Sequence, residues 1–411
     1  MFPLTPFPPY QLQLPNQKGS TMLRSLYSGI SGLSAHQKML DVTGNNIANV
    51  NTTGFKSSAV QFQDTLSQLV SDGSGPTGQI GGRNPAQIGL GVQLAGISTN
   101  FTQGSTQSTG KGTDLMISGD GFFVTSKAGD TMYTRSGAFS LDQAGNLVSS
   151  DGAFVQGWGA VNGVIQNGGP TSNIVLSGQT LAPAAATTAA VMAGNLPAEA
   201  AAGDQFVREI EVYDAAGAAS SLSVTFTRTA AGWDTSAALA GGATATGAMT
   251  FTNGVLTGGG TLNVGGIGID LSTVTGYTGM NTIAAKSQNG SAAGTLESFS
   301  IGADGTITGS FSNGTKIAVA QLAMATFDNP GGLEKAGNTS YAASVNSGNA
   351  IIGTGGSAGF GTMSSGSLEM SNVDLSQEFT NLIIAQRGFQ ANSRIITTSD
   401  SVLEELVNLK R

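Results

Sequence analysis

Few side chains in this 411-residue sequence are of the types that act as nucleophiles, acid–base catalysts or metal ligands. There is no Cys and one His, His36. Cysteine nucleophiles, disulfides and thiolate metal sites are therefore excluded, and a single His nearly excludes histidine-based chemistry. The segment GGSAG, residues 355–359, matches the G-x-S-x-G pattern of a hydrolase, with Ser357 as the nucleophile. We interpret it as a Gly-rich turn, because no helical pattern follows it and His36 belongs to a distant segment.

Pairs of carboxylates are the other group that could support chemistry, as in glycoside hydrolysis. The candidates are Asp142 with Asp151, and Glu209 and Glu211 with Asp214. Each lies beside a hairpin-type turn or on the outward face of an alternating segment, which is typical of solvated side chains. We therefore predict no catalytic, cofactor or metal site, and we do not expect an enzyme.

The composition indicates a folded, turn-rich protein with a weakly charged surface. The chain has 61 Gly, is 39% hydrophobic and only 10% charged, and carries a formal net charge of -8. This charge gives no electrostatic reason to bind nucleic acid or an anionic membrane. No apolar run approaches the roughly 20 residues of a membrane span, and the N-terminus lacks the pattern of a cleaved secretory signal. We expect neither nucleic-acid binding nor membrane insertion.

Both ends of the chain have the hydrophobic spacing of narrow helices. Alternating steps of four and three residues predict two heptad helices, which need partners to bury their seams. Near the N-terminus the spacing selects Leu26, Ile30, Leu33, Gln37, Leu40, Gly44 and Ile47. Near the C-terminus it selects Leu375, Phe379, Leu382, Gln386, Phe389, Ser393, Ile396, Asp400, Leu403 and Val407.

The region between these helices has the pattern of β structure. The segment SLSVTFTR places Leu222, Val224 and Phe226 on one face, and Asn-Gly and Asp-Gly turn signals recur from about residue 90 to 360. The predicted fold is therefore mainly β with terminal α-helices.

Changes in composition suggest the domain limits. We expect a helical terminal domain from residues 22–70 and 366–411, a Gly/Pro/Ser-rich linker at 71–89, an inner β domain from 90–165 and 300–365, and an outer inserted β domain at 166–299. Residues 1–21 are Pro-rich. They are either an extended arm or, if Met22 is the true start, a misassigned beginning.

The two ends resemble one protein family. The axial proteins of bacterial flagella, which form the rod and hook, have an N-terminal signature similar to LYSGISGLSAHQKMLDVTGNNIANVNTTGFKSSAVQF and a C-terminal signature similar to GSLEMSNVDLSQEFTNLIIAQRGFQANSRIITTSDSVLEELVNLKR. Their inner β domain resembles GKGTDLMISGDGFFV and YTRSGAFSLDQAGNLVSSDGAFVQGW. The segment SNVDLSQEFTNLIIAQR and the added middle domain are closer to hook members than to distal rod members.

The resemblance implies a structural subunit. The terminal helices are expected to pair as a coiled coil lining a central channel, and the subunits to polymerise into a curved, flexible tube that couples the rod to the filament and transmits torque. The implied partners are other copies of the chain, the distal rod protein, the hook cap protein, the hook–filament junction proteins and the flagellar type III export apparatus. The implied location is the extracellular flagellum, reached without a cleaved signal. Low charge in the outer domain would let neighbouring subunits slide as the tube bends.

Residues 45–56, NNIANVNTTGFK, are expected to belong to the assembly surface. The Asn45, Asn46 and Asn49 side chains can donate and accept hydrogen bonds together, so they either cap the helix end alone or also bridge to neighbouring subunits. Gly54 permits an outward turn, Phe55 can anchor it and Lys56 is expected to face a polar neighbour. The other expected assembly residues are Leu26, Ile30, Leu33, Leu40, Ile47, Leu375, Phe379, Leu382, Gln386, Arg387, Phe389, Ile396, Leu403 and Val407.

Two alternatives to a hook subunit remain open. A distal rod subunit would share the fold but form a straight shaft. A secreted β-rich adhesin would also suit the middle of the chain, but it has no use for two terminal heptad helices.

Overall fold

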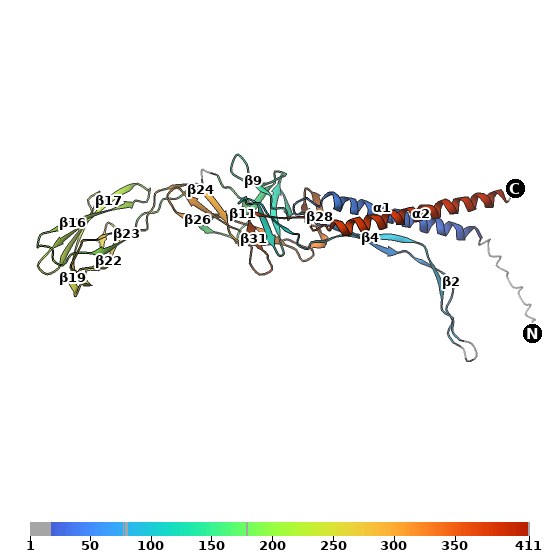
Figure 1. Cartoon of the computed structure of the whole chain (residues 1–411), viewed down its shortest axis with the longest axis horizontal. Coiled ribbons are helices and arrows are strands. Elements are labelled where there is room, and N and C mark those ends of the chain that lie inside the picture. The colour runs from blue at the N-terminus through green and yellow to red at the C-terminus, as the bar shows by residue number, and fades with distance from the viewer. Residues whose placement is uncertain (1–17, 77, 79–80, 178–179, 410–411) are drawn as a thin grey trace, which may run out of the picture.

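The chain is elongated, with its two helices at one end and two β domains in a row beyond them (Figure 1). The computed structural model describes residues 18–76, 78, 81–177 and 180–409. A thin β ribbon projects sideways beside the helices (Figure 1). The predicted fold, mainly β with a helix near each end, is confirmed.

The two helices are α1 (Lys18–Ala48) and α2 (Leu375–Asn408). Helix α1 begins before Met22, so residues 18–21 are helical rather than part of an extended arm. The rest of the predicted arm, residues 1–17, lies outside the described residues. Helix α2 begins at a capped end, because the Asp374 side chain accepts hydrogen bonds from the backbone N–H groups of Ser376 and Gln377.

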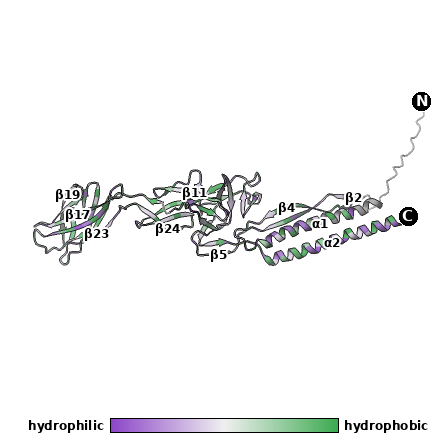
Figure 2. Ribbon diagram, turned by 90° about the horizontal axis from the view of Figure 1, so that it is seen from above, coloured by the Kyte–Doolittle hydropathy of each residue, from purple (hydrophilic) through white to green (hydrophobic). Residues whose placement is uncertain are grey.

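The helices lie side by side (Figure 2), but only half of each predicted seam faces the other helix. One set of positions spaced by seven is half-buried: Leu26, Leu33, Leu40 and Ile47 in α1, with Leu382, Phe389, Ile396 and Leu403 in α2. The second set lies one residue earlier than predicted and includes Gly29, Thr43 and Ala385, which are buried. The predicted seam residues that are exposed instead are Ile30, Gln37, Gly44, Leu375, Phe379, Gln386, Asp400 and Val407.

The shift of the second buried set by one residue has a steric cause. A Cβ atom on Gly29 would lie 3.4 Å from Ile396 Cγ1, and one on Gly32 only 2.8 Å from Asn392 Nδ2. The helices approach through small residues, and the separation of two packed helices depends on the side chains at their contact. A search for large apolar residues therefore selected Ile30 and missed Gly29.

The predicted linker is the end of the projecting β ribbon. Strands β1 (Ser58–Asp64) and β4 (Val92–Thr99) pair antiparallel, as do β2 (Ser67–Ser71) and β3 (Ala86–Gly89). The described part of the predicted linker, residues 71–89, therefore contains residues of two paired strands. The rest of the ribbon comes from segments that were predicted to belong to the helical domain and to the inner domain. Its apolar side chains include Leu66, Leu69 and Ile97, and all three are exposed.

The inner domain is built on one large sheet, whose main path runs β14-β24-β25-β26-β11-β7-β8-β29-β28. Its elements before the outer domain are β5 (Thr106–Ser108), β6 (Leu115–Ser118), β7 (Phe122–Lys127), β8 (Asp130–Thr134), β9 (Phe139–Leu141), β10 (Leu147–Ser149), β11 (Phe154–Val161), β12 (Val164–Ile165), β13 (Ser172–Asn173) and β14 (Leu181–Ala182). Those after it are β24 (Gly294–Ile301), β25 (Thr306–Phe311), β26 (Lys316–Leu322), β27 (Met324–Thr326), η1 (Pro330–Gly332), β28 (Glu334–Gly337), β29 (Ser340–Ala342), β30 (Ile351–Gly353), β31 (Thr362–Ser365) and β32 (Ser367–Glu369).

The outer domain has its own sheet and is smaller than predicted. Its strands are β15 (Ala189–Asn195), β16 (Gln205–Tyr213), β17 (Ala219–Arg228), β18 (Trp233–Leu239), β19 (Thr244–Thr252), β20 (Val255–Gly258), β21 (Thr261–Val264), β22 (Ile267–Thr275) and β23 (Ala284–Gln288). Strands β13 and β24 pair within the inner sheet instead. The Ala/Thr-rich segment before β15 therefore joins the domains, and the predicted limits of 166 and 299 are too wide.

Each β domain has a separate hydrophobic core. The outer core surrounds Trp233, Leu222 and Phe226, all of which are buried. The inner domain has one cluster around Phe123, Leu147 and Leu322 and a second around Trp158. Because the chain has only two Trp, one reports on each domain.

We predict that the two domains lose stability independently. Leu222→Ala should destabilise the outer domain by about 2–5 kcal/mol, because it leaves a cavity in that core. Thermal unfolding followed by Trp233 fluorescence in a Trp158→Phe background should shift to lower temperature, and Trp158 fluorescence in a Trp233→Phe background should not. Leu147→Ala is the matched inner-domain control and should give the reverse pattern. Equal shifts of both signals would contradict separate unfolding.

Candidate assembly interface

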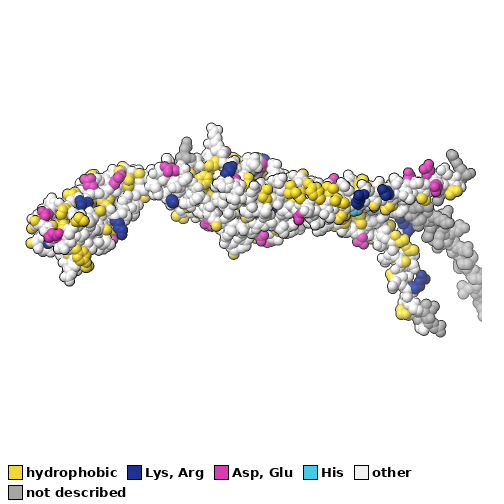
Figure 3. Space-filling model, viewed as in Figure 1, with side chains coloured by type: hydrophobic (Ala, Val, Ile, Leu, Met, Phe, Trp, Pro, Cys, Tyr) yellow, Lys and Arg dark blue, Asp and Glu magenta, His cyan; other side chains and the backbone are white. Residues whose placement is uncertain are grey.

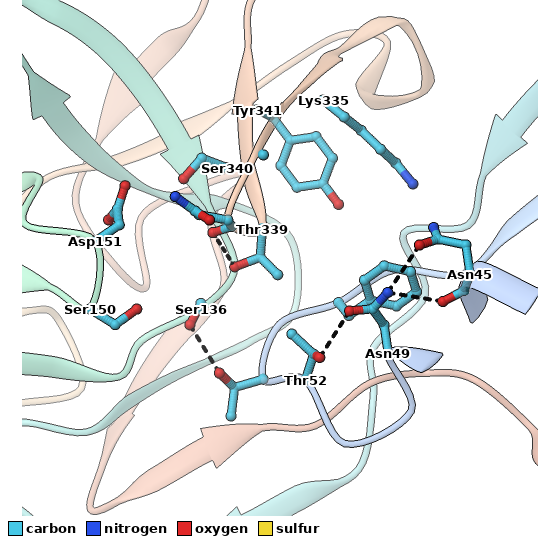
Figure 4. Close-up of a pocket in the computed structure, with 14 residues that line it drawn as sticks. Asn45, Asn49, Thr52, Ser136, Ser150, Asp151, Lys335, Thr339, Ser340 and Tyr341 are labelled. Atoms are coloured by element: carbon cyan, nitrogen blue, oxygen red, sulfur yellow. Dashed lines mark hydrogen bonds between the residues drawn. The ribbon is translucent and has the colours of Figure 1, made fainter. Parts of the chain in front are cut away.

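The end of α1 is closed by its own Asn and Thr side chains (Figure 4). Asn49 Nδ2 donates to the Asn45 carbonyl oxygen at 2.9 Å, and Thr52 Oγ1 donates to Asn49 Oδ1 at 3.0 Å. The Asn45 carbonyl also accepts from the Asn49 backbone N–H at 3.2 Å, so the side chain adds a second bond to it at the end of the helix. The first of the two predicted roles for these asparagines, capping of the helix end, is therefore present for Asn49.

Asn46 joins three segments inside one subunit. Its side chain is buried, donates to the Ser58 carbonyl oxygen at 2.8 Å and to Glu378 Oε1 at 2.9 Å, and accepts from the Ser58 N–H at 3.1 Å. Ser58 begins β1 and Glu378 lies in the first turn of α2. Asn46 thus holds α1 to both, and its amide is used within the chain.

Gly54 is required where the chain leaves α1 for the inner domain. Its φ of 69° is in the left-handed region, and a Cβ atom there would lie 2.5 Å from the Ser136 backbone nitrogen. Its own N–H donates to the Glu369 carbonyl oxygen at 2.8 Å. The outward turn that the sequence predicts at Gly54 is therefore present, and it brings residues 54, 136 and 369 together.

Lys56 lies fully buried, and its polar neighbours belong to its own chain. Its ammonium contacts Glu369 Oε1 at 2.5 Å and donates to the Thr102 carbonyl oxygen at 2.8 Å. The other Glu369 oxygen, Oε2, lies 3.6 Å from a guanidinium nitrogen of Arg135, which is also buried. One carboxylate between two cations therefore ties the end of α1, the inner domain and the segment before α2. We call these three residues the junction triad.

Burial sets the electrostatics of the junction triad. Loss of hydration lowers the pKa of Lys56, and the hydrogen bond and charge of Glu369 oppose that shift. Loss of hydration also lowers the pKa of Arg135, again opposed by Glu369. The Arg135 guanidinium lies 5.2 Å from the centre of the Phe122 ring, a favourable cation–π contact. The carboxylate of Glu369 is what makes two buried cations tolerable here.

Several large apolar side chains on the outside of the helix pair are left exposed by the described chain. Ile30 and Phe379, two predicted seam residues, are 49% and 52% exposed, and Ile383 and Ile384 are 57% and 53% exposed. Figure 3 shows hydrophobic side chains gathered along the ribbon and where the helices meet the inner domain. Exposed apolar patches of this kind are typical of protein–protein contact surfaces. The assembly role of the individual heptad residues and of Arg387, which is exposed, stays a prediction.

The residues considered for chemistry have structural surroundings. Ser357 Oγ donates to the Thr354 carbonyl oxygen, and the His36 ring packs against Gly388 of α2. Asp214 accepts from two backbone N–H groups of its own turn. No group of three His, Asp or Glu side chains among the described residues is placed to hold a metal ion.

Comparisons with known proteins identify the family. Models of the flagellar basal body rod protein, the flagellar hook protein FlgE/F/G D1 domain and the flagellar basal body rod FlgEFG protein C-terminal match residues 26–56, 116–192 and 364–409. The flagellar hook protein FlgE of Treponema pallidum is 39% identical, with 95% of this chain and all of that protein covered. The FlgE of Borreliella burgdorferi is 40% identical with the same coverage.

The chain belongs to the flagellar hook protein family. The FlgG rod protein of Bacillus subtilis is 35% identical over the same share of this chain. This lower similarity makes the distal rod alternative the weaker one. Flagellar hook proteins are structural, so membership confirms the prediction of a structural subunit rather than an enzyme. Neither described helix is long and apolar enough to cross a membrane.

Sequence reasoning found one member of the junction triad, Lys56, and missed Arg135 and Glu369. Glu369 lies 313 residues from Lys56 in the sequence, and no local spacing connects them. Sequence reasoning also missed that Glu378, in the first turn of α2, accepts from Asn46. The sequence gives only an indirect sign that Lys56 has a carboxylate partner. A Lys directly after a Gly-Phe turn must be either solvated or paired.

We predict that Glu369→Gln destabilises this hook-family subunit by about 3–5 kcal/mol, because Lys56 and Arg135 then lose their counter-charge while buried. Trp158 fluorescence during thermal unfolding, in a Trp233→Phe background, measures the change. Glu334→Gln, at an exposed Glu on β28, is the matched control and should be nearly neutral. A loss below about 1 kcal/mol for Glu369→Gln would show that the junction triad does not hold the joint.

Proposed function

We propose that this chain polymerises into the tubular flagellar hook, a curved and flexible coupling between rod and filament that transmits torque. The observation that carries the proposal is the set of exposed apolar side chains on the outside of the helix pair, which includes Ile30, Phe379 and Ile383. Its burial requires other chains, because the described part of the subunit provides nothing to cover it. Copies packed around an axis would bury it and leave the β domains outside.

The energetics favour coupling of folding to assembly. A buried Ile side chain contributes about 1.5–3 kcal/mol, and Ile383, Ile384 and Ile30 remain largely exposed in the single subunit. Two helices whose large seam residues are only half-buried gain stability when copies cover their outer faces. In the polymer we propose that the helices form a coiled coil lining a central channel.

The same proposal specifies partners and route. The polymer would contact the distal rod protein at its base, the hook cap protein during growth and the hook–filament junction proteins at its far end. The subunit would leave the cell through the flagellar type III export apparatus without a cleaved signal. Relatives named as hook proteins support the flagellum as the location.

We propose a division of roles within residues 45–56. Asn46 and Lys56 hold the subunit together, as their buried bonds within the chain indicate. Asn45 and Asn49 line an open cavity instead. Contacts between subunits in this segment would therefore use Asn45 and Asn49 rather than Asn46 and Lys56.

We predict that Ile384→Asp blocks polymerisation without destabilising the subunit. A carboxylate on the outer face of α2 would have to be desolvated in the tube, whereas it stays hydrated in the monomer. Subunits are salted out and viewed by negative-stain electron microscopy, and Trp158 and Trp233 report monomer stability. Val207→Asp, at an exposed valine of the outer domain, is the matched control and should still polymerise.

The wild-type images test the function itself. Curved tubes with a central channel are expected. Straight tubes would favour the rod alternative, and the absence of any polymer from folded subunits would overturn the proposal.

A further inference from the structure

An open cavity lies beside the helix–domain joint, between the turn after α1 and the β28–β29 hairpin (Figure 4). Its volume is about 690 Å³. Asn45, Asn49 and Thr52 form one wall, and Lys335 and Tyr341 form part of the opposite one. The lining is rich in hydrogen-bonding groups, and hook assembly as outlined above assigns it no occupant.

Lys335 is a cation without a carboxylate partner on this wall. Its ammonium donates to Ser58 Oγ at 2.8 Å and lies 5.4 Å from the centre of the Phe55 ring. The surrounding protein removes enough water to lower the pKa of Lys335. The ion pairs of the described residues join Lys38 to Asp41, Lys127 to Asp151, and Lys56 and Arg135 to Glu369, so none includes Lys335. An ammonium has three N–H groups, and among the described residues only Ser58 accepts from that of Lys335.

Asp151 is the acidic residue among the described residues that line the cavity, and it already has partners. Asp151 lines the cavity, but its Oδ2 pairs with Lys127 at 3.1 Å and its Oδ1 accepts from Ser149. The described chain therefore places the ammonium of an exposed residue, Lys335, beside an open cavity, and no carboxylate of that chain pairs with it. An anionic group entering from outside would complete the pair.

The hairpin that carries Lys335 is held in a strained shape. Asn338 and Thr339, in the turn between β28 and β29, have φ values of 50° and 57°. This left-handed region is costly for a β-branched residue such as Thr. The Thr134 hydroxyl fixes the turn by donating to the Thr339 carbonyl oxygen at 3.0 Å. Backbone strain of this kind persists where surrounding contacts impose it, and here it fixes one rim of the cavity.

We propose that this cavity receives an Asp or Glu side chain of a second copy of the chain, and that its carboxylate pairs with Lys335 in the polymer. The inference rests on the proposed polymerisation. Charge complementarity favours a second copy as the source, because the chain carries 25 Asp and Glu against 17 Lys and Arg. The cavity wall also includes Asn45 of α1, the helix whose exposed Ile30 already requires neighbouring copies.

The first test removes the charge and keeps the stem of the side chain. Lys335→Met should raise the critical concentration for polymerisation about tenfold, which equals about 1.4 kcal/mol per added subunit. Lys316→Met, at an exposed Lys of β26, makes the same change in net charge and should alter it less than about twofold. Trp158 fluorescence should give both variants the wild-type unfolding temperature. Equal critical concentrations for Lys335→Met and wild type would overturn the inference.

The second test identifies the source of the carboxylate. Polymers are formed from an equal mixture of 14N-labelled and 15N-labelled subunits and treated with a water-soluble carbodiimide, which joins an amine to a paired carboxylate. Mass spectrometry should find Lys335 peptides linked to acidic peptides of the opposite label. The Lys127–Asp151 pair, which lies within one chain, should link only peptides of the same label and serves as the internal control.

The outcomes separate this inference from the function on which it rests. Wild-type tubes in which Lys335 stays unlinked, or links only to its own chain, overturn the pairing and leave the hook function intact. Failure of wild-type subunits to polymerise overturns both.

Discussion

The arrangement of the subunit depends on one carboxylate buried between two cations. Glu369 meets Lys56 and Arg135 where water is excluded, and these residues come from the end of α1, the inner domain and the strand before α2. A buried ion pair often adds little net stability compared with apolar packing. Its strength lies in the penalty for every other arrangement, since moving any one segment would leave a charge buried without its partner. The joint is therefore fixed in direction, and with it the helix faces that must meet other copies.

The contact between α1 and α2 also leaves the subunit dependent on other copies. Gly29, Gly32 and Ala385 allow the two backbones to approach, while the large side chains of one heptad set are only half-buried in the seam. Other large side chains, including Phe379, Ile383 and Ile384, lie exposed on the outside of the pair. If the seam held large apolar residues at both sets of positions, more apolar surface would be buried within the pair and less would remain for assembly. The exposed apolar side chains therefore leave the single subunit incomplete.

The sequence predicted features that are encoded locally. Seven-residue spacing located both helices, alternation with Asn-Gly turns indicated the β domains, and Gly54 marked the turn out of α1. Features that depend on distant partners were missed. Glu369 has no local pattern that links it to Lys56, and the seam uses Gly29, which hydrophobic periodicity ignores. Residues 71–89 have the composition of a linker because Gly and Pro near the tip of the ribbon conceal the pairing of β2 with β3. The predicted limits of the outer domain, 166 and 299, are too wide because strand pairing, rather than composition, sets them.

The distribution of charge pairs bears on how such a subunit could bend. Within the described residues every ion pair lies in α1, at the junction triad or in the inner domain, and none lies in the outer domain. The outer domain depends on its apolar core and backbone pairing, which are indifferent to how its surface charges are placed. Its carboxylates Glu209 and Asp214 are exposed. A tube made of such subunits would have its ion pairs near the axis and an outer surface without them. Contacts between outer domains could then change during rotation without breaking ion pairs, while the junction triad kept the direction of the joint.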